Sequence, residues 1–330
     1  MFTRVLGRSG IKVSAVGLGC AMIGGQFYDA EGQPLSWGDM DDAQAIRAIH
    51  RAMDLGINLF DTADMYGAGH SEEVLGQALK GRRDRTVIAT KFGDVMDPVT
   101  RRALGTDGRP ESIHPALEAS LRRLGTAYVD LYQFHIWGHP AEEAVPIREV
   151  LETLVNEGKI RGYAWSTDVL ASLEVFARGP NCIAVQNELN LFRCDDEILA
   201  LCERENLASI NRSPLAMGVL TGKYRADTKF AADDARSHVP WYVWFADGKP
   251  SENHLKQLNA VREILASGGR TLAQGALAWI WGRSDRTIPI PGFRTLQQAE
   301  ENARAMDFGP LAPEQMAEIE ALLGRTHSPK

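Results

Sequence analysis

The stretch PESIHPALEASLRRLGTAYVDLYQFH, residues 110–135, contains one predicted helix and one predicted strand, the two elements that alternate along this chain. Residues 110–125 have the length and pattern of a helix, and residues 129–135 form a short apolar run typical of a buried strand. Another apolar run, TVIATKFG at residues 86–93, precedes the helix. Strands joined by a helical crossover must be parallel, so these segments predict a strand, a helix and a second, parallel strand.

The same alternation continues along almost the whole chain. Strands are predicted at residues 13–19, 58–63, 86–93, 129–135, 160–167, 183–189, 208–215 and 287–293. Helices are predicted at residues 41–56, 71–80, 110–125, 145–159, 169–178, 196–207, 252–267, 271–282, 295–306 and 313–324. Asp41 or Asp42 is expected to cap the first helix and Ser71 the second.

Eight strands, each followed by a helix, predict a (β/α)8 TIM barrel, an α/β fold that usually takes about 250 residues. The remaining length fits an N-terminal β-hairpin over residues 2–14, with its turn at Ser9-Gly10, and extra helices after strand 7 and at the C-terminus. A doubly wound sheet is the competing architecture, but GLGCAMIGG at residues 17–25 has the wrong spacing for its GxGxxG fingerprint. We expect one domain spanning residues 1–330, because no linker-like segment interrupts the pattern.

Composition argues against several classes of function. A net charge of −7 does not favour binding to nucleic acid or to a membrane surface. The four cysteines, Cys20, Cys182, Cys194 and Cys202, do not have the spacing of a zinc site and are expected to be free thiols in a reducing compartment. The N-terminus lacks the apolar core of a signal peptide, and no apolar run is long enough to span a membrane. These features predict a cytoplasmic protein with no bound metal.

Four chemically active side chains follow consecutive predicted strands. Asp61 ends the second strand and Tyr66 lies in its loop, while Lys91 and His135 end the third and fourth strands. Each residue alone has a structural explanation: a turn cap, a packed ring, a surface ammonium or a satisfied buried histidine. Together they are hard to explain as packing, because the C-terminal ends of barrel strands converge on one mouth.

At this point the sequence resembles the aldo-keto reductase family over nearly its whole length. The motifs that carry the resemblance are GLG (17–19), DTADMYG (61–67), ATKFG (89–93), HIW (135–137), WST (165–167), VQNELN (185–190), SPLAMGVLTGKY (213–224) and IPGFRTLQQAEENARA (290–305). The resemblance implies an enzyme with a barrel that binds NADP(H) and reduces an aldehyde or ketone. It also gives the four side chains their roles.

Tyr66 would protonate the carbonyl oxygen as hydride adds to the carbonyl carbon. A phenol is a weak acid, with a reference pKa of about 10, and a nearby ammonium favours the phenolate. Lys91 would supply that charge, Asp61 would pair with Lys91, and His135 would orient the carbonyl oxygen. The carboxylate at the end of the strand would therefore have a partner that offsets its cost of burial.

The resemblance also implies the cofactor contacts. Gln186 and Ser166 match positions that bind the nicotinamide carboxamide, the segment through Lys223 lies along the pyrophosphate, and Arg294 suits a 2′-phosphate. The full expected set is Gly19, Cys20, Ala21, Asp61, Ser166, Thr167, Gln186, Arg212, Ser213, Pro214, Leu215, Gly218, Leu220, Thr221, Gly222, Lys223, Gly292, Arg294, Gln298, Glu301 and Asn302.

Two positions depart from the family pattern. Thr167 stands where the family usually has asparagine, which puts one carboxamide contact in question. Arg212 stands where the family often has an aromatic residue stacked on the nicotinamide. A guanidinium can stack on a flat ring or bind the substrate as a cation, and the sequence does not choose between these roles.

The substrate is less readable than the reaction. Tyr66 and His135 would contact it, and Trp37, Trp137, Trp241 and Trp244 either line its pocket or pack the lid. A sugar aldehyde is the favoured hypothesis. The alternative function is a cofactor-binding regulatory subunit of a channel-like complex, which the four intact catalytic positions disfavour. A metal-dependent hydrolase is disfavoured because the strand ends carry no HxH or paired-carboxylate cluster.

Overall fold

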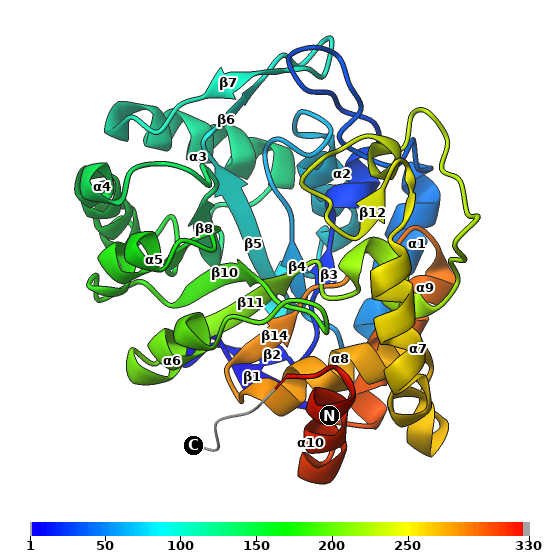
Figure 1. Cartoon of the computed structure of the whole chain (residues 1–330). Helices are drawn as coiled ribbons and strands as arrows, with labels where there is room; N and C mark the ends of the chain where they lie inside the picture. The colour runs from blue at the N-terminus through cyan, green and yellow to red at the C-terminus, as the bar shows by residue number, and fades with distance from the viewer. Residues whose placement is uncertain (1, 326–330) are drawn as a thin grey trace.

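The computed structural model describes residues 2–325 and has a parallel β-barrel at its centre, surrounded by helices (Figure 1). The barrel strands are, in order around the barrel, β3 (Leu18–Gly19), β4 (Leu59–Asp61), β5 (Val87–Phe92), β8 (Leu131–Phe134), β9 (Tyr163–Trp165), β10 (Ala184–Glu188), β11 (Ala208–Arg212) and β14 (Thr287–Pro289). Neighbouring strands pair in parallel, and bridges between Ser166 and Gln186 and between Gly19 and Gly292 join the two runs of strands. The predicted (β/α)8 barrel is confirmed.

Helices follow the strands as the sequence predicts. Those that cover the barrel are α1 (Asp42–Asp54), α2 (His70–Leu79), α3 (Pro110–Leu124), α4 (Ala144–Asn156), α5 (Leu170–Ala177), α6 (Asp196–Arg204), α8 (Leu272–Arg283) and α9 (Leu296–Arg304). The additional helices are α7 (Glu252–Ala266), after β11, and α10 (Pro313–Leu322), near the C-terminus. Asp41 caps α1, as one of the two predicted candidates, by accepting a hydrogen bond from the Gln44 backbone N–H at 2.7 Å. Within residues 2–325, no helix has both the length and the apolar character needed to cross a bilayer.

Two local predictions are wrong. The single strand expected at residues 13–19 is two strands, since Lys12–Ser14 (β2) pairs with Thr3–Val5 (β1) in the N-terminal hairpin and only Leu18–Gly19 enters the barrel. Ser71 does not cap the second helix, which begins at His70. The Ser71 hydroxyl instead donates to the Cys20 carbonyl oxygen at 2.7 Å and lies 2.8 Å from the Thr62 hydroxyl. A buried hydroxyl needs a partner, and tertiary contacts supply it here.

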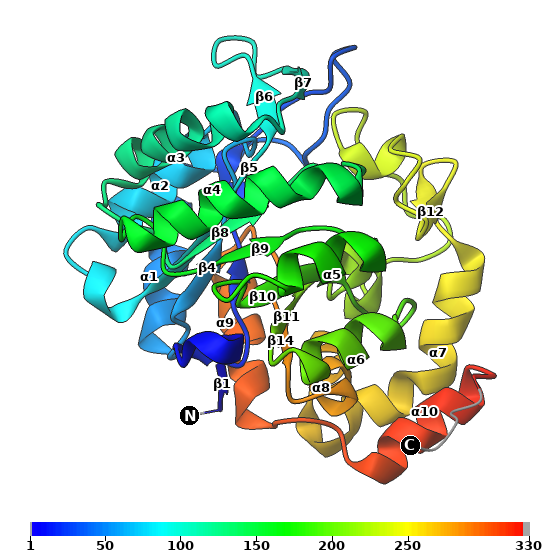
Figure 2. The same cartoon turned by 90° about the vertical axis from the view of Figure 1, so that its left-hand side faces the viewer.

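The N-terminal hairpin closes one end of the barrel. Leu6, Ile11 and Val13 join the apolar cluster that fills the lumen. Gly7 has a φ of +53°, and a Cβ there would lie 2.1 Å from the Ile183 carbonyl oxygen, so the chain approaches too closely for any other residue. Arg8 donates to the Glu205 carbonyl oxygen at 2.6 Å. Figure 2 shows β1 at the end of the barrel opposite the β6 and β7 segment.

Strand alternation determines which side chains reach the open end. On β5, Val87 and Ala89 point into the lumen, and Lys91 continues that face with the period of two that strands impose. The same rule places a polar layer above the apolar lumen: Asp61, Lys91, Gln133, Ser166 and Gln186. Two hairpins that the sequence did not predict flank this end, β6 (Asp94–Met96) with β7 (Ala103–Thr106) and β12 (Phe245–Ala246) with β13 (Lys249–Pro250).

Candidate active site

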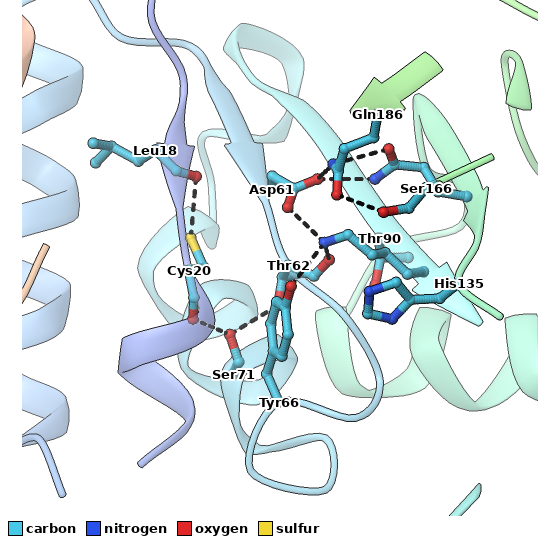
Figure 3. Close-up of polar contacts among 12 residues, drawn as sticks. Leu18, Cys20, Asp61, Thr62, Tyr66, Ser71, Thr90, His135, Ser166 and Gln186 are labelled. Carbon is cyan, nitrogen blue, oxygen red and sulfur yellow. Dashed lines mark hydrogen bonds and ion pairs between the residues drawn. The ribbon is translucent and has the colours of Figure 1, made fainter. Parts of the chain in front are cut away.

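The centre of the site is the fully buried ammonium of Lys91. Its Nζ donates to Asp61 Oδ1 at 2.5 Å, to the Thr62 carbonyl oxygen at 2.8 Å and to the Tyr66 hydroxyl at 3.2 Å (Figure 3). Three acceptors match the three protons of an ammonium group. The structure therefore brings Asp61, Tyr66 and Lys91 into direct contact although they lie on different segments.

Asp61 is held at both carboxylate oxygens. Oδ2 accepts hydrogen bonds from Gln133 Nε2 and from Gln186 Nε2, each at 2.8 Å, while Oδ1 faces Lys91. Gln186 Oε1 in turn accepts from Ser166 Oγ at 3.1 Å. The sequence analysis missed Gln133, although it is the one amide in the strand predicted at residues 129–135 and shares the lumen face of Leu131.

Tight backbone packing explains the glycine beside Tyr66. Gly67 has a φ of +63°, and a Cβ on it would lie 2.0 Å from the Gly24 carbonyl oxygen. A Cβ on Gly24 would likewise lie 2.7 Å from the Tyr66 backbone. These two glycines let the segment after β3 press against the loop after β4, and that contact holds Tyr66 over Lys91.

His135 completes the predicted group of four. Its backbone N–H donates to the Phe92 carbonyl oxygen at 2.8 Å, and its ring meets the ring of Tyr66 edge to face at 6.2 Å. His135 Nδ1 lies 3.0 Å from Asp94 Oδ2. Asp94 was not singled out from the sequence, because it belongs to the unpredicted hairpin β6–β7.

Burial and charge act in opposite directions on Tyr66. Burial raises the pKa of the Tyr66 hydroxyl, the nearby Lys91 charge lowers it, and the net pKa lies above the usual value for tyrosine. Lys91 opposes the effect of burial, as expected, but does not outweigh it in the protein alone. For Lys91, burial lowers the pKa, whereas the charges of Asp61 and Tyr66 raise it, and the net pKa is raised. Lys91 is thus kept cationic and Tyr66 protonated.

A cavity of about 770 Å³ opens above this group at the C-terminal ends of the strands. Most of the residues that were expected to bind cofactor or substrate line it, including Tyr66, His135, Ser166, Gln186 and Arg294. The expected residues that do not line it are Thr167, Leu220 and Gly222, and Lys91 lies behind its wall. Lining residues that the sequence analysis did not name are Met22, Phe27, Leu35, Met65, Glu188, Arg193, Met217, Arg236, Tyr242, Ala273, Ile290, Pro291 and Phe293.

The two departures from the family pattern have structural partners. Thr167 is fully buried, and its hydroxyl donates to the Trp137 carbonyl oxygen at 3.0 Å, so it does not face the cavity. The Arg212 guanidinium is paired with Asp168 and, at 3.3 Å, with Glu188. The same two carboxylates also face Arg193, at 3.6 Å and 3.7 Å, so two guanidiniums and two carboxylates form one paired cluster and Arg212 is not a free cation.

One end of the cavity carries three cationic side chains, Lys223, Arg236 and Arg294. Burial lowers the pKa of Lys223, and repulsion from Arg236 and Arg294 lowers it further. Arg236 is paired with Asp234. Arg294 donates to the carbonyl oxygens of Trp37 and, at 3.0 Å, Asp39. A polyanion placed here would relieve the mutual repulsion, so this end fits the phosphates of a nucleotide.

Backbone shape at the neighbouring loop fits the same ligand. Ser213, Ala216 and Met217 have φ values of +52°, +46° and +51°, and Gly218 has +95°. Non-glycine residues in this region store strain, and such residues cluster at ligand sites. Within this loop the Ala216 N–H donates to the Ser213 carbonyl oxygen and the Gly218 N–H to the Leu215 carbonyl oxygen, both at 2.9 Å, so the segment forms tight turns at the cavity wall.

The four candidate tryptophans all line the cavity, but they differ in packing and exposure. Trp37 stacks on Tyr242 at 6.3 Å with an angle of 6° between the rings. Trp244 is only 2% exposed and packs in the core, whereas Trp137 and Trp241 are 50% and 57% exposed at the rim. In residues 2–325, no group of three or more His, Cys, Asp or Glu side chains is placed to hold a metal ion.

Comparison with known proteins identifies related chains. Residues 15–323 match the family described as "Aldo/keto reductase family". The aldo-keto reductase YhdN of Bacillus subtilis is 31% identical over 298 residues, covering 88% of this chain and 85% of that protein.

Two solved structures share the whole architecture. The glycerol dehydrogenase AKR11B4 from Gluconobacter oxydans superimposes with a TM-score of 0.81 at 30% identity, covering 99% of this chain and 98% of that one. An aldo-keto reductase from Klebsiella pneumoniae, solved in complex with NADPH, superimposes with a TM-score of 0.70 at 28% identity, covering 99% of this chain and 97% of that one.

Proposed function

The chain belongs to the aldo/keto reductase family, and from its site we propose that it reduces an aldehyde or ketone to the alcohol, with NADPH as reductant and Tyr66 as proton donor. The observation that carries this proposal is the 3.2 Å contact between Lys91 Nζ and the Tyr66 hydroxyl, with Asp61 2.5 Å from the same ammonium. Family membership makes the chain an oxidoreductase that acts on carbonyl compounds. The roles of individual residues and the substrate are the proposal.

The residues of the site would act on a carbonyl in a defined way. Negative charge develops on the carbonyl oxygen during reduction, and the Tyr66 O–H bond breaks as its proton moves to that oxygen. The phenolate left behind lies beside the Lys91 ammonium, which stabilises it. Asp61 keeps Lys91 charged although the Lys91 side chain is completely buried. Solvent then returns a proton to Tyr66.

NADPH would supply the hydride from the same cavity. The residues that would hold its phosphates are Lys223 and Arg294, together with the left-handed loop at residues 213–218. Gln186 and Ser166 would orient the nicotinamide. Gln186 Nε2 already donates to Asp61 and Gln133, and its Oε1 accepts from Ser166 Oγ, which leaves one lone pair of Oε1 for the cofactor. The solved relative from Klebsiella pneumoniae that contains NADPH supports this cofactor for the present chain.

We propose a polyhydroxylated aldehyde of the sugar type as substrate. Trp137 and Trp241 offer half-exposed rings, on which the C–H face of a sugar can pack, and Glu188 and Arg193 add polar groups to the same cavity lining. The structural similarity to a glycerol dehydrogenase supports a polyol-type substrate. A panel of sugar, aliphatic and aromatic aldehydes tests this proposal, and equal or lower kcat/KM for the sugars would contradict it.

The test of the reaction itself is Tyr66→Phe. Loss of the proton donor should reduce turnover by roughly 10²–10⁴-fold. NADPH affinity, measured by fluorescence titration, should stay within a few-fold of wild type because the phosphate-binding end is unchanged. Tyr28→Phe is the matched control, since Tyr28 does not line the cavity and should keep full activity. Wild-type turnover in Tyr66→Phe would show that another group donates the proton.

A further inference from the structure

The hairpin β6–β7 places a carboxylate beside the site histidine. Gly93, just before the hairpin, has a φ of +122°, and a Cβ there would lie 2.7 Å from Ile136 Cγ1. Its carbonyl oxygen accepts from the Asp107 backbone N–H at 2.7 Å, which closes the base of the hairpin. The turn at Gly93 therefore directs Asp94 back toward the end of β8, where His135 lies.

The contact between these two side chains is close and enclosed. Asp94 Oδ2 lies 3.0 Å from His135 Nδ1, and both side chains are less than one-fifth exposed. Both atoms are buried, and in the part of the chain that the structure describes neither makes a hydrogen bond of normal geometry, so each has the other as its near polar neighbour at 3.0 Å. At that separation a nitrogen lone pair would repel the carboxylate, whereas an N–H is attracted to it.

We propose that Asp94 is a positioning residue that keeps a proton on His135 Nδ1, so that His135 presents an N–H to a substrate carbonyl only as the doubly protonated imidazolium. A neutral imidazole has a single N–H. If that hydrogen is on Nδ1, then Nε2 carries a lone pair, and a carbonyl oxygen also offers only lone pairs. The second proton on Nε2 is needed before His135 can orient a carbonyl.

This inference rests on the proposed reduction and adds a condition to it. In the reductive direction Tyr66 gives up its proton and His135 keeps both of its own. In the oxidative direction the same step runs in reverse: the Tyr66 phenolate takes the hydroxyl proton of the alcohol while charged His135 donates to the same oxygen.

Other ionisable groups surround the pair. Tyr66, from the loop after β4, faces the His135 ring at 6.2 Å, and Lys91 on β5 lies behind Tyr66. Burial raises the pKa of Asp64 well above its usual value, and repulsion from Glu72 and Asp94 adds to the shift. Asp94 is the carboxylate in contact with His135.

The direct test is the tautomer of His135, read from the imidazole ¹⁵N chemical shifts of the labelled protein at alkaline pH. We expect Nδ1–H in the wild type. In Asp94→Asn the amide N–H can donate to Nδ1, so the proton should move to Nε2. An Nε2–H tautomer in the wild type, or identical tautomers in the two proteins, would overturn the proposal. This readout does not depend on turnover, so it stands apart from a failure of the proposed function.

The kinetic test compares pH profiles of aldehyde reduction between about pH 6 and pH 9. We expect kcat/KM of the wild type to fall about tenfold or more toward alkaline pH. In Asp94→Asn the fall should shrink to about twofold, because neutral His135 can then donate from Nε2.

Two control variants make this comparison specific. Asp94→Glu retains the carboxylate and should retain the alkaline fall. Asp97→Asn removes the same charge from the loop of the same hairpin, where Asp97 accepts from the Val99 backbone N–H, and should leave the profile unchanged. If Asp94→Asn and the wild type share one profile, or Asp97→Asn flattens it equally, Asp94 does not set the proton on His135.

Discussion

Replacing Lys91 with methionine would separate the contribution of the Lys91–Asp61 pair to stability from its contribution to turnover. Both side chains are almost completely buried, so removal of the cation leaves the Asp61 carboxylate with only the amides of Gln133 and Gln186. Removing one partner of a buried pair costs about 3–5 kcal/mol. An unfolding entropy of ~2.1 cal/mol/K per residue, summed over the 330 residues, converts that loss into a fall in Tm of roughly 4–7 °C.

The double variant Lys91→Met with Asp61→Asn removes both charges. An asparagine can accept the same hydrogen bonds from the two glutamines without a net charge, so Tm should recover most of the loss. Turnover should not recover, because Tyr66 still lacks a cation to stabilise its phenolate. We expect both variants to be slower than wild type by roughly 10²–10⁴-fold.

Differential scanning calorimetry and single-turnover reduction of an aldehyde, carried out on all three proteins, provide the two measurements. A single variant with wild-type Tm would show that Asp61 does not need Lys91. A double variant that regained turnover would show that the ammonium is not needed for the chemical step. Either result would refute the reasoning from the 2.5 Å and 3.2 Å contacts.

Three further outcomes follow from the geometry of the cavity. The pKa of Lys223 is lowered in the free protein, so NADPH affinity should be full below that pKa and fall as pH rises through it. Calorimetry in buffers of different ionisation enthalpy should show proton uptake on binding. Lys223→Met should remove the pH dependence, and persistence of the dependence would assign the titration to another group. Gly67→Ala should lower kcat by more than about tenfold while leaving NADPH affinity near wild type, because a Cβ would lie 2.0 Å from the Gly24 carbonyl oxygen and displace the Tyr66 loop. Asp168→Asn frees one side of Arg212 and should lower KM severalfold for aldehydes that carry a carboxylate, but not for neutral aldehydes; a fall for both would implicate general loosening of the rim.

Much of this site follows from patterns that are local in the sequence. The alternation of strand and helix predicts the barrel, and the period of two within each strand brings Asp61, Lys91 and His135 to one end of it. Tyr66 could be placed because its loop is short. These predictions succeed because they need only chain order, strand period and the convergence of strand ends.

The missed features depend on contacts between distant segments. Asp94 comes close to His135 only through a hairpin whose strands are three and four residues long, and such strands have little apolar pattern of their own. The strand expected at residues 13–19 was divided because its first part pairs with the N-terminal segment. Thr167 was expected to reach the cofactor, whereas its hydroxyl is used by the Trp137 backbone. No local pattern reports those partners.

The hairpin β1–β2 at the far end of the barrel also affects the order in which the cofactor and the substrate bind and leave. Since Leu6, Ile11 and Val13 fill that end, the cofactor and the carbonyl compound would both enter the cavity from the opposite end of the barrel. The reactant that sits deeper has to arrive first and depart last. Double-reciprocal plots of initial rates should therefore show intersecting lines. An inhibitor bound near the cavity entrance should slow the dissociation of the reactant that is bound deeper in the cavity.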